Sequence, residues 1–155
     1  MKAAFFAVAL AAAHLTGLAT TRSARADWGD EVRATYLAFA AAQNARDLKS
    51  VRSLLLDSPQ FLWVSDGRSV WGPDATIARM ASFQEAEVWR VEPALADAVP
   101  VRMGTGSAFL HLPLRLVIGS AAEPDRLKFL VTALCSRTAD GWRIAALFTT
   151  TDKSD

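Results

Sequence analysis

Apolar residues recur every three or four positions in three stretches of the chain, as in amphipathic helices. The longest stretch, 27–46, has one apolar face and acidic residues in its first turn, where the helix dipole favours them. A shorter apolar face over 48–55 ends before Pro59, since proline lacks a backbone donor. A third helix is predicted over 72–83, where Pro73 suits the first turn.

Elsewhere the apolar positions alternate with a period of two, which is typical of strands. Residues 61–71 predict a β-hairpin, because Asp66-Gly67 is a strong turn signal between β-forming residues. The remaining strands are predicted at 87–93, 97–103, 108–119, 127–137 and 142–150.

The alternation also predicts which face of each strand points inward. Strand 108–119 carries a continuous leucine row, which we expect to face the helices, whereas His111 and Arg115 face away. The last strand places Trp142, Ile144, Ala146 and Phe148 on one side. Helices that precede a run of antiparallel strands indicate an α+β fold, with three N-terminal helices packed on a mostly antiparallel sheet.

The first residues have the form of a secretory signal peptide. Lys2 precedes an apolar segment at 3–18, and Ala24-Arg25-Ala26 has the small-x-small form of a cleavage site. An uncleaved membrane anchor is the alternative, but the segment is short for a spanning helix. We therefore expect residues 1–26 to be removed, 27–155 to form a single domain, and the product to be periplasmic or secreted, without membrane attachment.

Charge and composition exclude several classes of function. Cleavage would leave 14 basic and 16 acidic residues without a basic run, so a nucleic-acid partner is not expected. Cys135 is the only cysteine, which excludes an internal disulfide and favours a buried apolar role. His111 would be the only remaining histidine, so a histidine-rich zinc site is excluded. No cofactor motif is present, and we expect no metal or cofactor.

Three short motifs then suggest a family. They are "NARDL" at 44–48, "DGRSVWGPDATI" at 66–77 and "GWRIAAL" at 141–147. With the order of elements, they resemble the NTF2-like superfamily, which includes SnoaL-like and ketosteroid-isomerase-like domains and many secreted bacterial members. The resemblance implies a cone in which a curved sheet wraps a long N-terminal helix around an apolar pocket. It also implies a wide choice of functions: isomerases, cyclases, dehydratases, ligand binders and dimerisation modules share this fold.

The catalytic residues of the ketosteroid isomerases have no counterpart when the motifs are brought into register. Their oxyanion-binding tyrosine falls on Phe39 and their oxyanion-binding aspartate near Ala133. Their base falls near residues 63–65, with Asp66 beyond it in the turn. No catalytic residue is therefore assigned by the resemblance.

An open cone would instead expose an apolar lining from several elements. We expect this lining to include Tyr36, Phe39, Trp63, Met80, Trp89 and Phe148. Such a site favours a flat apolar ligand oriented by the single phenol, with Trp71 packed under the third helix. The alternative is that Trp63 fills the cone with its own side chain.

Three functions remain open. The favoured one is binding of a small apolar molecule without the usual catalytic set. A second is an isomerase, cyclase or dehydratase with a non-standard acid or base, such as Tyr36 or Asp66. A third is a dimeric interaction scaffold; a homodimer would use the outer sheet face, where His111, Arg115 and Thr132 suit an interface.

Arg79 is expected to be solvated.

Overall fold

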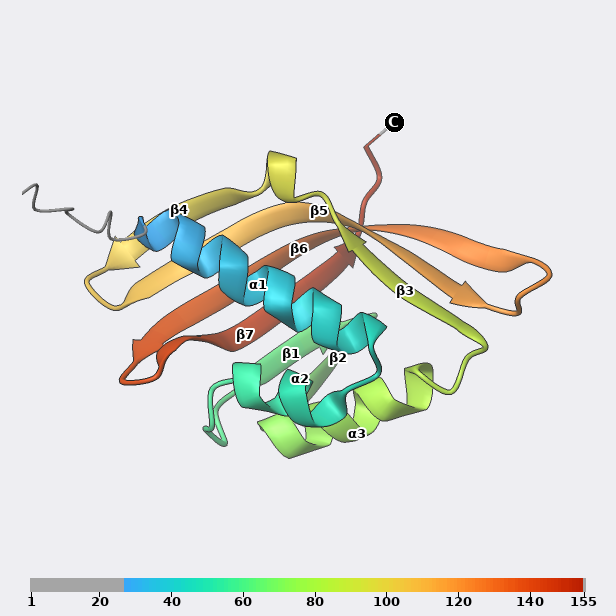
Figure 1. Cartoon of the computed structure of the whole chain (residues 1–155), viewed down its shortest axis with the longest axis horizontal. Coiled ribbons are helices and arrows are strands. Elements are labelled where there is room, and N and C mark those ends of the chain that lie inside the picture. The colour runs from blue at the N-terminus through green and yellow to red at the C-terminus, as the bar shows by residue number, and fades with distance from the viewer. Residues whose placement is uncertain (1–26, 155) are drawn as a thin grey trace, which may run out of the picture.

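Three α-helices and seven strands make up the part of the chain, residues 27–154, that the computed structural model describes (Figure 1). The predicted signal peptide, 1–26, lies outside these residues. The elements are α1 (Trp28–Asn44), α2 (Leu48–Leu54), β1 (Leu62–Ser65), β2 (Arg68–Trp71), α3 (Pro73–Phe83), β3 (Val88–Pro93), the 3₁₀ turn η1 (Leu95–Asp97), β4 (Val99–Gly104), β5 (Ser107–Gly119), β6 (Pro124–Thr138) and β7 (Gly141–Thr151).

All strands belong to one curved sheet in the order β2-β1-β7-β6-β5-β3, with β4 pairing beside β3 on the same edge of β5. Every pairing is antiparallel except that of β1 with β7. Helix α1 runs across the sheet, and α2 and α3 lie together at one end (Figure 1). The predicted α+β cone of three helices on a mostly antiparallel sheet is confirmed.

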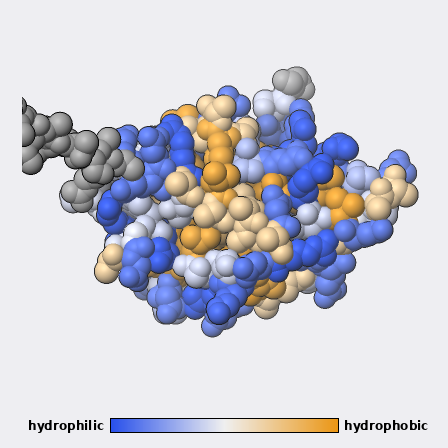
Figure 2. Space-filling model, in the orientation of Figure 1, coloured by the Kyte–Doolittle hydropathy of each residue, from blue (hydrophilic) through white to orange (hydrophobic). Residues whose placement is uncertain are grey.

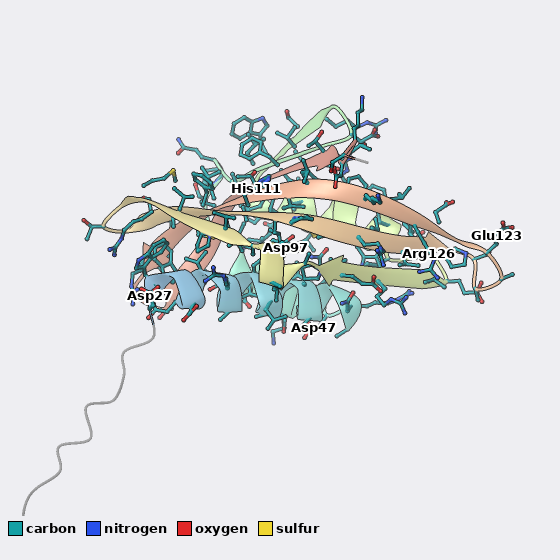
Figure 3. The ribbon with its side chains drawn as sticks, turned by 90° about the horizontal axis from the view of Figure 1, so that it is seen from above. Asp27, Asp47, Asp97, His111, Glu123 and Arg126 are labelled. Atoms are coloured by element: carbon teal, nitrogen blue, oxygen red, sulfur yellow. The ribbon has the colours of Figure 1, made fainter. Side chains whose placement is uncertain are left out.

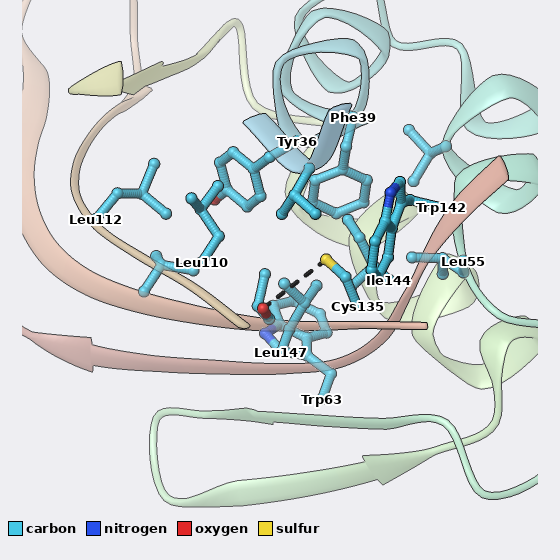
Figure 4. Packing of buried hydrophobic residues seen from close by; sticks show 14 of the residues in the cluster. Tyr36, Phe39, Leu55, Trp63, Leu110, Leu112, Cys135, Trp142, Ile144 and Leu147 are labelled. Carbon is cyan, nitrogen blue, oxygen red and sulfur yellow. Dashed lines mark hydrogen bonds between the residues drawn. The ribbon is translucent and has the colours of Figure 1, made fainter. Parts of the chain in front are cut away.

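Helix α1 supplies the centre of the core. Val32, Tyr36, Phe39 and Gln43 follow one another at helical spacing, and all four are buried. Their side chains meet the buried face of the sheet, and Figure 4 shows Tyr36 and Phe39 directed from α1 toward it. Cys135 is 2% exposed in this cluster, as expected of a small apolar residue.

The "NARDL" motif ends α1 and links it to strand β3. Asn44 exchanges two hydrogen bonds with the backbone of Val91 on β3, at 2.8 and 2.6 Å. Arg46, at a φ of 56°, donates to the backbone carbonyls of Gln84, Ala86 and Glu87 between α3 and β3. Asp47 then caps α2 through the backbone N–H of Ser50, at 3.0 Å. The motif thereby fixes the segment that joins α3 to β3.

The leucine row of β5 faces the helices, as predicted. Leu110 and Leu112 are fully buried in the core, and Leu114 and Leu116 continue the same face. His111 lies on the opposite face, where its Nδ1 is 3.0 Å from Thr132 Oγ1 on β6. Figure 3 shows His111 on the side of the sheet away from α1.

The prediction for β7 is wrong beyond Ile144. Leu134 pairs with Ala146 but Cys135 pairs with Ile144, so Ala145 is an extra residue in a β-bulge. A bulge reverses the alternation of faces that follows it. Leu147 therefore points inward with 3% exposure, and Phe148 points outward with 39% exposure. Trp71 is also 59% exposed on β2 and does not pack under α3.

Candidate functional site

A cavity of about 720 Å³ opens where α1 leaves the sheet, between α3, β3 and the far ends of β5, β6 and β7. Apolar side chains supply most of its wall: Tyr36, Phe39, Trp63, Met80, Phe83, Trp89, Val91, Leu114, Leu116, Ile118, Leu127, Phe129, Val131 and Leu147. In Figure 2, apolar residues gather in the middle of the face on which α1 lies, with hydrophilic residues around them. The core is thus continuous with a cavity instead of being closed on all sides.

Five of the six predicted lining residues border this cavity: Tyr36, Phe39, Trp63, Met80 and Trp89. Phe148 does not, because the bulge in β7 turns it to the outer face of the sheet and puts Leu147 in its place. A ligand-binding role for the five residues stays a prediction.

One wall of the cavity is a group of three aromatic rings. The rings of Phe83 and Trp89 are stacked, with centroids 6.4 Å apart and planes 8° apart. Trp63 meets Phe83 edge to face, also at 6.4 Å. Trp63 Nε1 lies 3.4 Å from Thr149 Oγ1, so the central tryptophan is held by β7 as well as by the rings. Such packing fixes a flat apolar wall.

Arg79 of α3 lies against this wall, contrary to the prediction that it is solvated. Its Cζ is 4.9 Å from the centroid of the Trp63 ring and 5.6 Å from that of Phe83. Nη2 donates to the backbone carbonyl of Ser65 at 3.3 Å, but Nη1 is buried without an acceptor. Among the described residues, Trp89 Nε1 is the only other buried side-chain nitrogen without a partner. We call Trp63, Arg79, Phe83 and Trp89 the Arg79 cluster.

Sequence reasoning missed this residue although a signal was available. Arg79 precedes Phe83 by four positions on a helix, and residues so spaced lie on one face. A cation on the same face as a large aromatic side chain can stack on it instead of extending into water.

The charged side chains around the cavity are mostly cations. Arg79, Lys128 and Lys153 border it, and Asp66, in the β1–β2 turn, is the one acidic residue among the described lining residues. Asp66 is exposed and has a φ of 51°, which the left-handed turn requires. The electrostatic field of the lining therefore favours a ligand with negative charge.

Tyr36 lies at the inner end of the cavity, with its ring centroid 5.8 Å from that of Phe39. Burial, with a smaller contribution from Cys135, raises the pKa of the Tyr36 hydroxyl well above its ordinary value near 10. The hydroxyl therefore stays protonated at neutral pH. It can donate a hydrogen bond to a ligand, but it is a poor general base.

Residues 27–154 contain no group of three or more His, Cys, Asp or Glu side chains placed to hold a metal ion. None of the helices that the structure describes is long and apolar enough to cross a membrane.

Residues 32–147 match the SnoaL-like domain family, and the chain therefore belongs to that family within the NTF2-like superfamily. Comparison with curated protein sequences gives no match.

Solved structures share the fold at low sequence identity. A proposed dehydratase of the NTF2-like family from Streptomyces avermitilis superposes with a TM-score of 0.71 and 18% identity, over 81% of this chain and 96% of its own. A ketosteroid isomerase-like protein from Erwinia carotovora atroseptica gives 0.66 and 17%, over 83% and 98%. An NTF-2-like protein of unknown function from Shewanella oneidensis gives 0.65 and 15%, over 77% and 96%. These likenesses establish the fold.

Proposed function

We propose that this SnoaL-like domain binds a small, flat, largely apolar molecule in the cavity beside α3. The observation that carries the proposal is the cavity itself, about 720 Å³ in volume and lined mainly by aromatic and aliphatic side chains. Pockets for small molecules commonly measure about 300–1,000 Å³ and combine an apolar wall with a few polar groups. Tyr36 supplies one such group at the inner end.

The position of Trp63 supports an open cavity over a cone filled by its own side chains. Trp63 is 8% exposed, so its ring is packed, yet it borders the cavity instead of occupying it. Its contacts with Phe83 and Thr149 hold it at the wall. A ligand could lie against this ring without displacing it.

The alternative of an isomerase, cyclase or dehydratase depends on Asp66 and Tyr36. Asp66 is exposed at a hairpin turn, and the raised pKa of Tyr36 opposes a role as base. The solved relatives named for dehydratase or isomerase activity share the fold alone. The exposure of Asp66 and the raised pKa of Tyr36 both favour binding over catalysis.

The direct test is calorimetric titration of the purified protein with 2-naphthamide, a neutral flat aromatic compound. Leu116→Trp should reduce the affinity at least tenfold, because Leu116 borders the cavity and a larger side chain would fill it. Leu130→Trp is the matched control, since Leu130 precedes the inward-facing Val131 and does not border the cavity. Absence of binding by the wild-type protein, or equal loss in both variants, would contradict the proposal.

A second proposal concerns assembly, and the outer sheet face supports it. Cross-strand neighbours on that face are largely apolar and several are exposed: Leu62, Val64, Trp71, Val99, Val101, Phe109, Leu134 and Phe148. We propose that this face forms a homodimer around the His111–Thr132 pair. Sedimentation analysis of the wild type should give twice the monomer mass, and Phe148→Asp should give the monomer. A monomeric wild type would refute this proposal.

Export is proposed from the sequence of residues 1–26 alone. Cleavage after Ala26 would give a product that begins at Asp27 and resides in the periplasm or outside the cell. Intact-mass measurement of the protein recovered from a secreting bacterial host is the test, and a mature species that retains Lys2 would disprove it.

A further inference from the structure

Two residues of the Arg79 cluster that border the cavity each keep a hydrogen-bond donor without an acceptor. The donors are Arg79 Nη1 and Trp89 Nε1, and both are buried. A buried donor without a partner costs about 1–3 kcal/mol, so native proteins rarely keep two in one cluster. We infer that the ligand of this cavity is an aromatic or alicyclic carboxylate, and that Arg79 and Trp89 bind its carboxylate group. This inference rests on the proposed binding function and specifies its ligand.

The opposite end of the same cone shows how such a pair of donors is satisfied. There the Cζ of Arg137 lies 5.7 Å from the centroid of the Trp142 ring. One carboxylate oxygen of Glu31 accepts hydrogen bonds from Arg137 Nη1 at 2.5 Å and from Trp142 Nε1 at 3.0 Å. The protein thus supplies its own carboxylate to an arginine and an indole N–H at that end.

No side-chain carboxylate of the described residues forms an ion pair with Arg79, the arginine of the open end. Asp66 borders the same cavity but is exposed in the turn. Lys128 and Lys153 add positive charge around the cavity. The described residues thus contain no counterpart of Glu31 at this end. The proposal is that an external anion takes that place, and the apolar wall requires that the rest of the molecule be largely hydrophobic.

Binding requires a limited movement of Arg79. Nη1 is buried and the guanidinium lies over the rings of Trp63 and Phe83, while Arg79 borders the cavity. Arginine has a long flexible stem, and its planar guanidinium matches a carboxylate with two parallel hydrogen bonds. A carboxylate in the cavity would draw the guanidinium off the Trp63 ring.

Three probes of one shape separate the role of charge from that of apolar contact. They are 2-naphthoate, the neutral 2-naphthamide and the cationic 2-naphthylmethylamine, each titrated by calorimetry into the purified protein at pH 7. A charge-assisted pair of hydrogen bonds predicts that naphthoate binds about 10–100-fold more tightly than naphthamide. The amine should bind most weakly of the three.

Variants then assign the preference to the cluster. Arg79→Gln should reduce the affinity for naphthoate about 10–100-fold and leave that for naphthamide within about threefold. Arg79→Lys should recover part of the preference, because it keeps the charge but loses the planar fork. Trp89→Phe keeps the stacked ring and removes the N–H, so it should weaken naphthoate alone, by about threefold to tenfold.

The matched control is Arg102→Gln. Arg102 also lies over a tryptophan, with its Cζ 5.3 Å from the centroid of the Trp28 ring, but it does not border the cavity. This variant should bind all three probes like the wild type. An equal loss in both arginine variants would overturn the inference, since it would reflect the net charge of the protein.

The outcomes also separate this inference from the proposed function. If naphthoate and naphthamide bind equally and Arg79→Gln changes neither affinity, the cavity binds apolar molecules but the carboxylate assignment is wrong. If no probe binds to the wild type, both the proposed function and this inference are wrong.

Discussion

The two ends of the cone share the long strands of the sheet but differ in how the side chains of those strands are packed. Along the inward face of β5, Leu110 and Leu112 are fully buried beneath α1, whereas Leu114 and Leu116 border the cavity. The leucine row is uniform in sequence, and the change arises because α1 no longer covers the strand. At the open end, α3 and the sheet's own edge strand β3 border the cavity, and α3 lies at one end of the sheet (Figure 1).

The polar groups follow the same division. At the closed end, Glu31 accepts hydrogen bonds from Arg137 and Trp142, and the buried indole N–H is satisfied. At the open end, Arg79 and Trp89 each retain a buried donor without a partner. The closed end satisfies its donors with its own carboxylate, whereas the open end does not, and this difference is the basis of the proposal that the open end binds an external acceptor. The difference between the two ends should appear in how much substitutions at each end change the free energy of unfolding.

The largest expected effect is at the closed end of the leucine row. Leu112→Ala should lower the free energy of unfolding by about 2–5 kcal/mol, because a fully buried leucine leaves a cavity that its neighbours cannot fill. Leu116→Ala should cost less than about 1.5 kcal/mol, since this side chain already borders an open space. Urea unfolding of both variants measures the difference.

His111→Ala is the control on the outer face and should cost less than about 1 kcal/mol. An equal cost for Leu112→Ala and Leu116→Ala would mean that the open end is packed as tightly as the closed end.

The second prediction concerns alkaline pH. Burial raises the pKa of the Cys135 thiol from about 9 to about 12 and raises that of Tyr36 as well. Each group binds its proton more tightly when folded, so its contribution to stability is complete below the unfolded pKa and is lost as pH rises toward the folded pKa. Between pH 8 and pH 10.5, ionisation of Cys135 in the unfolded chain should lower stability by about 2 kcal/mol.

Cys135→Ala tests this assignment. The variant should be less stable at pH 7 but should lose stability less steeply between pH 8 and pH 10.5, as measured by urea unfolding at each pH. The same slope in the variant and the wild type would exclude Cys135 as the cause.

The sequence predicted the fold well because its signals are local. Helical spacing in α1 and α3, and the alternation along β5, depend only on neighbouring residues, and each α-helix and strand was found within a few positions of its observed bounds. Phe148 was misplaced because the bulge at Ala145 depends on the pairing of β7 with β6, which periodicity within one strand does not reveal. Every inward position after the bulge was inverted as a result.

The polar part of the candidate site could not be predicted for a related reason. Arg79 is defined by its contacts with Trp63 on β1 and by the shared wall with Trp89 on β3. These elements meet only in three dimensions, so the sequence showed an ordinary charged residue on a helix. The apolar lining was easier, because large side chains at inward positions must gather somewhere within one small core.

The third prediction concerns Glu31, which supplies the carboxylate at the closed end. Glu31→Gln should lower the free energy of unfolding by about 1–2 kcal/mol, because it removes a charge-assisted bond to Arg137 and weakens the bond to Trp142. The group is partly exposed, with 25% of the Glu31 side chain accessible, so the cost is smaller than for a fully buried pair. Thermal and urea unfolding give the measurement, and Asp30→Asn, at an exposed carboxylate on the same helix, is the control.

The smallest expected effect is at Arg79, and it tests the division most directly. Arg79→Met removes a stacked cation, which stabilises by about 0.5–1 kcal/mol, and the hydrogen bond to the Ser65 carbonyl, which adds about 0.5–1 kcal/mol. It also removes a buried donor without a partner, which costs about 1–3 kcal/mol. These opposing contributions should cancel to within about 0.5 kcal/mol in urea unfolding. Arg137→Met should instead lower stability by about 1 kcal/mol, because that arginine is already paired with Glu31. A loss of more than about 1 kcal/mol for Arg79→Met would assign Arg79 a structural role equivalent to that of Arg137. A neutral Arg79→Met, together with a destabilised Arg137→Met, would show that the open end carries its arginine for a purpose other than holding the fold.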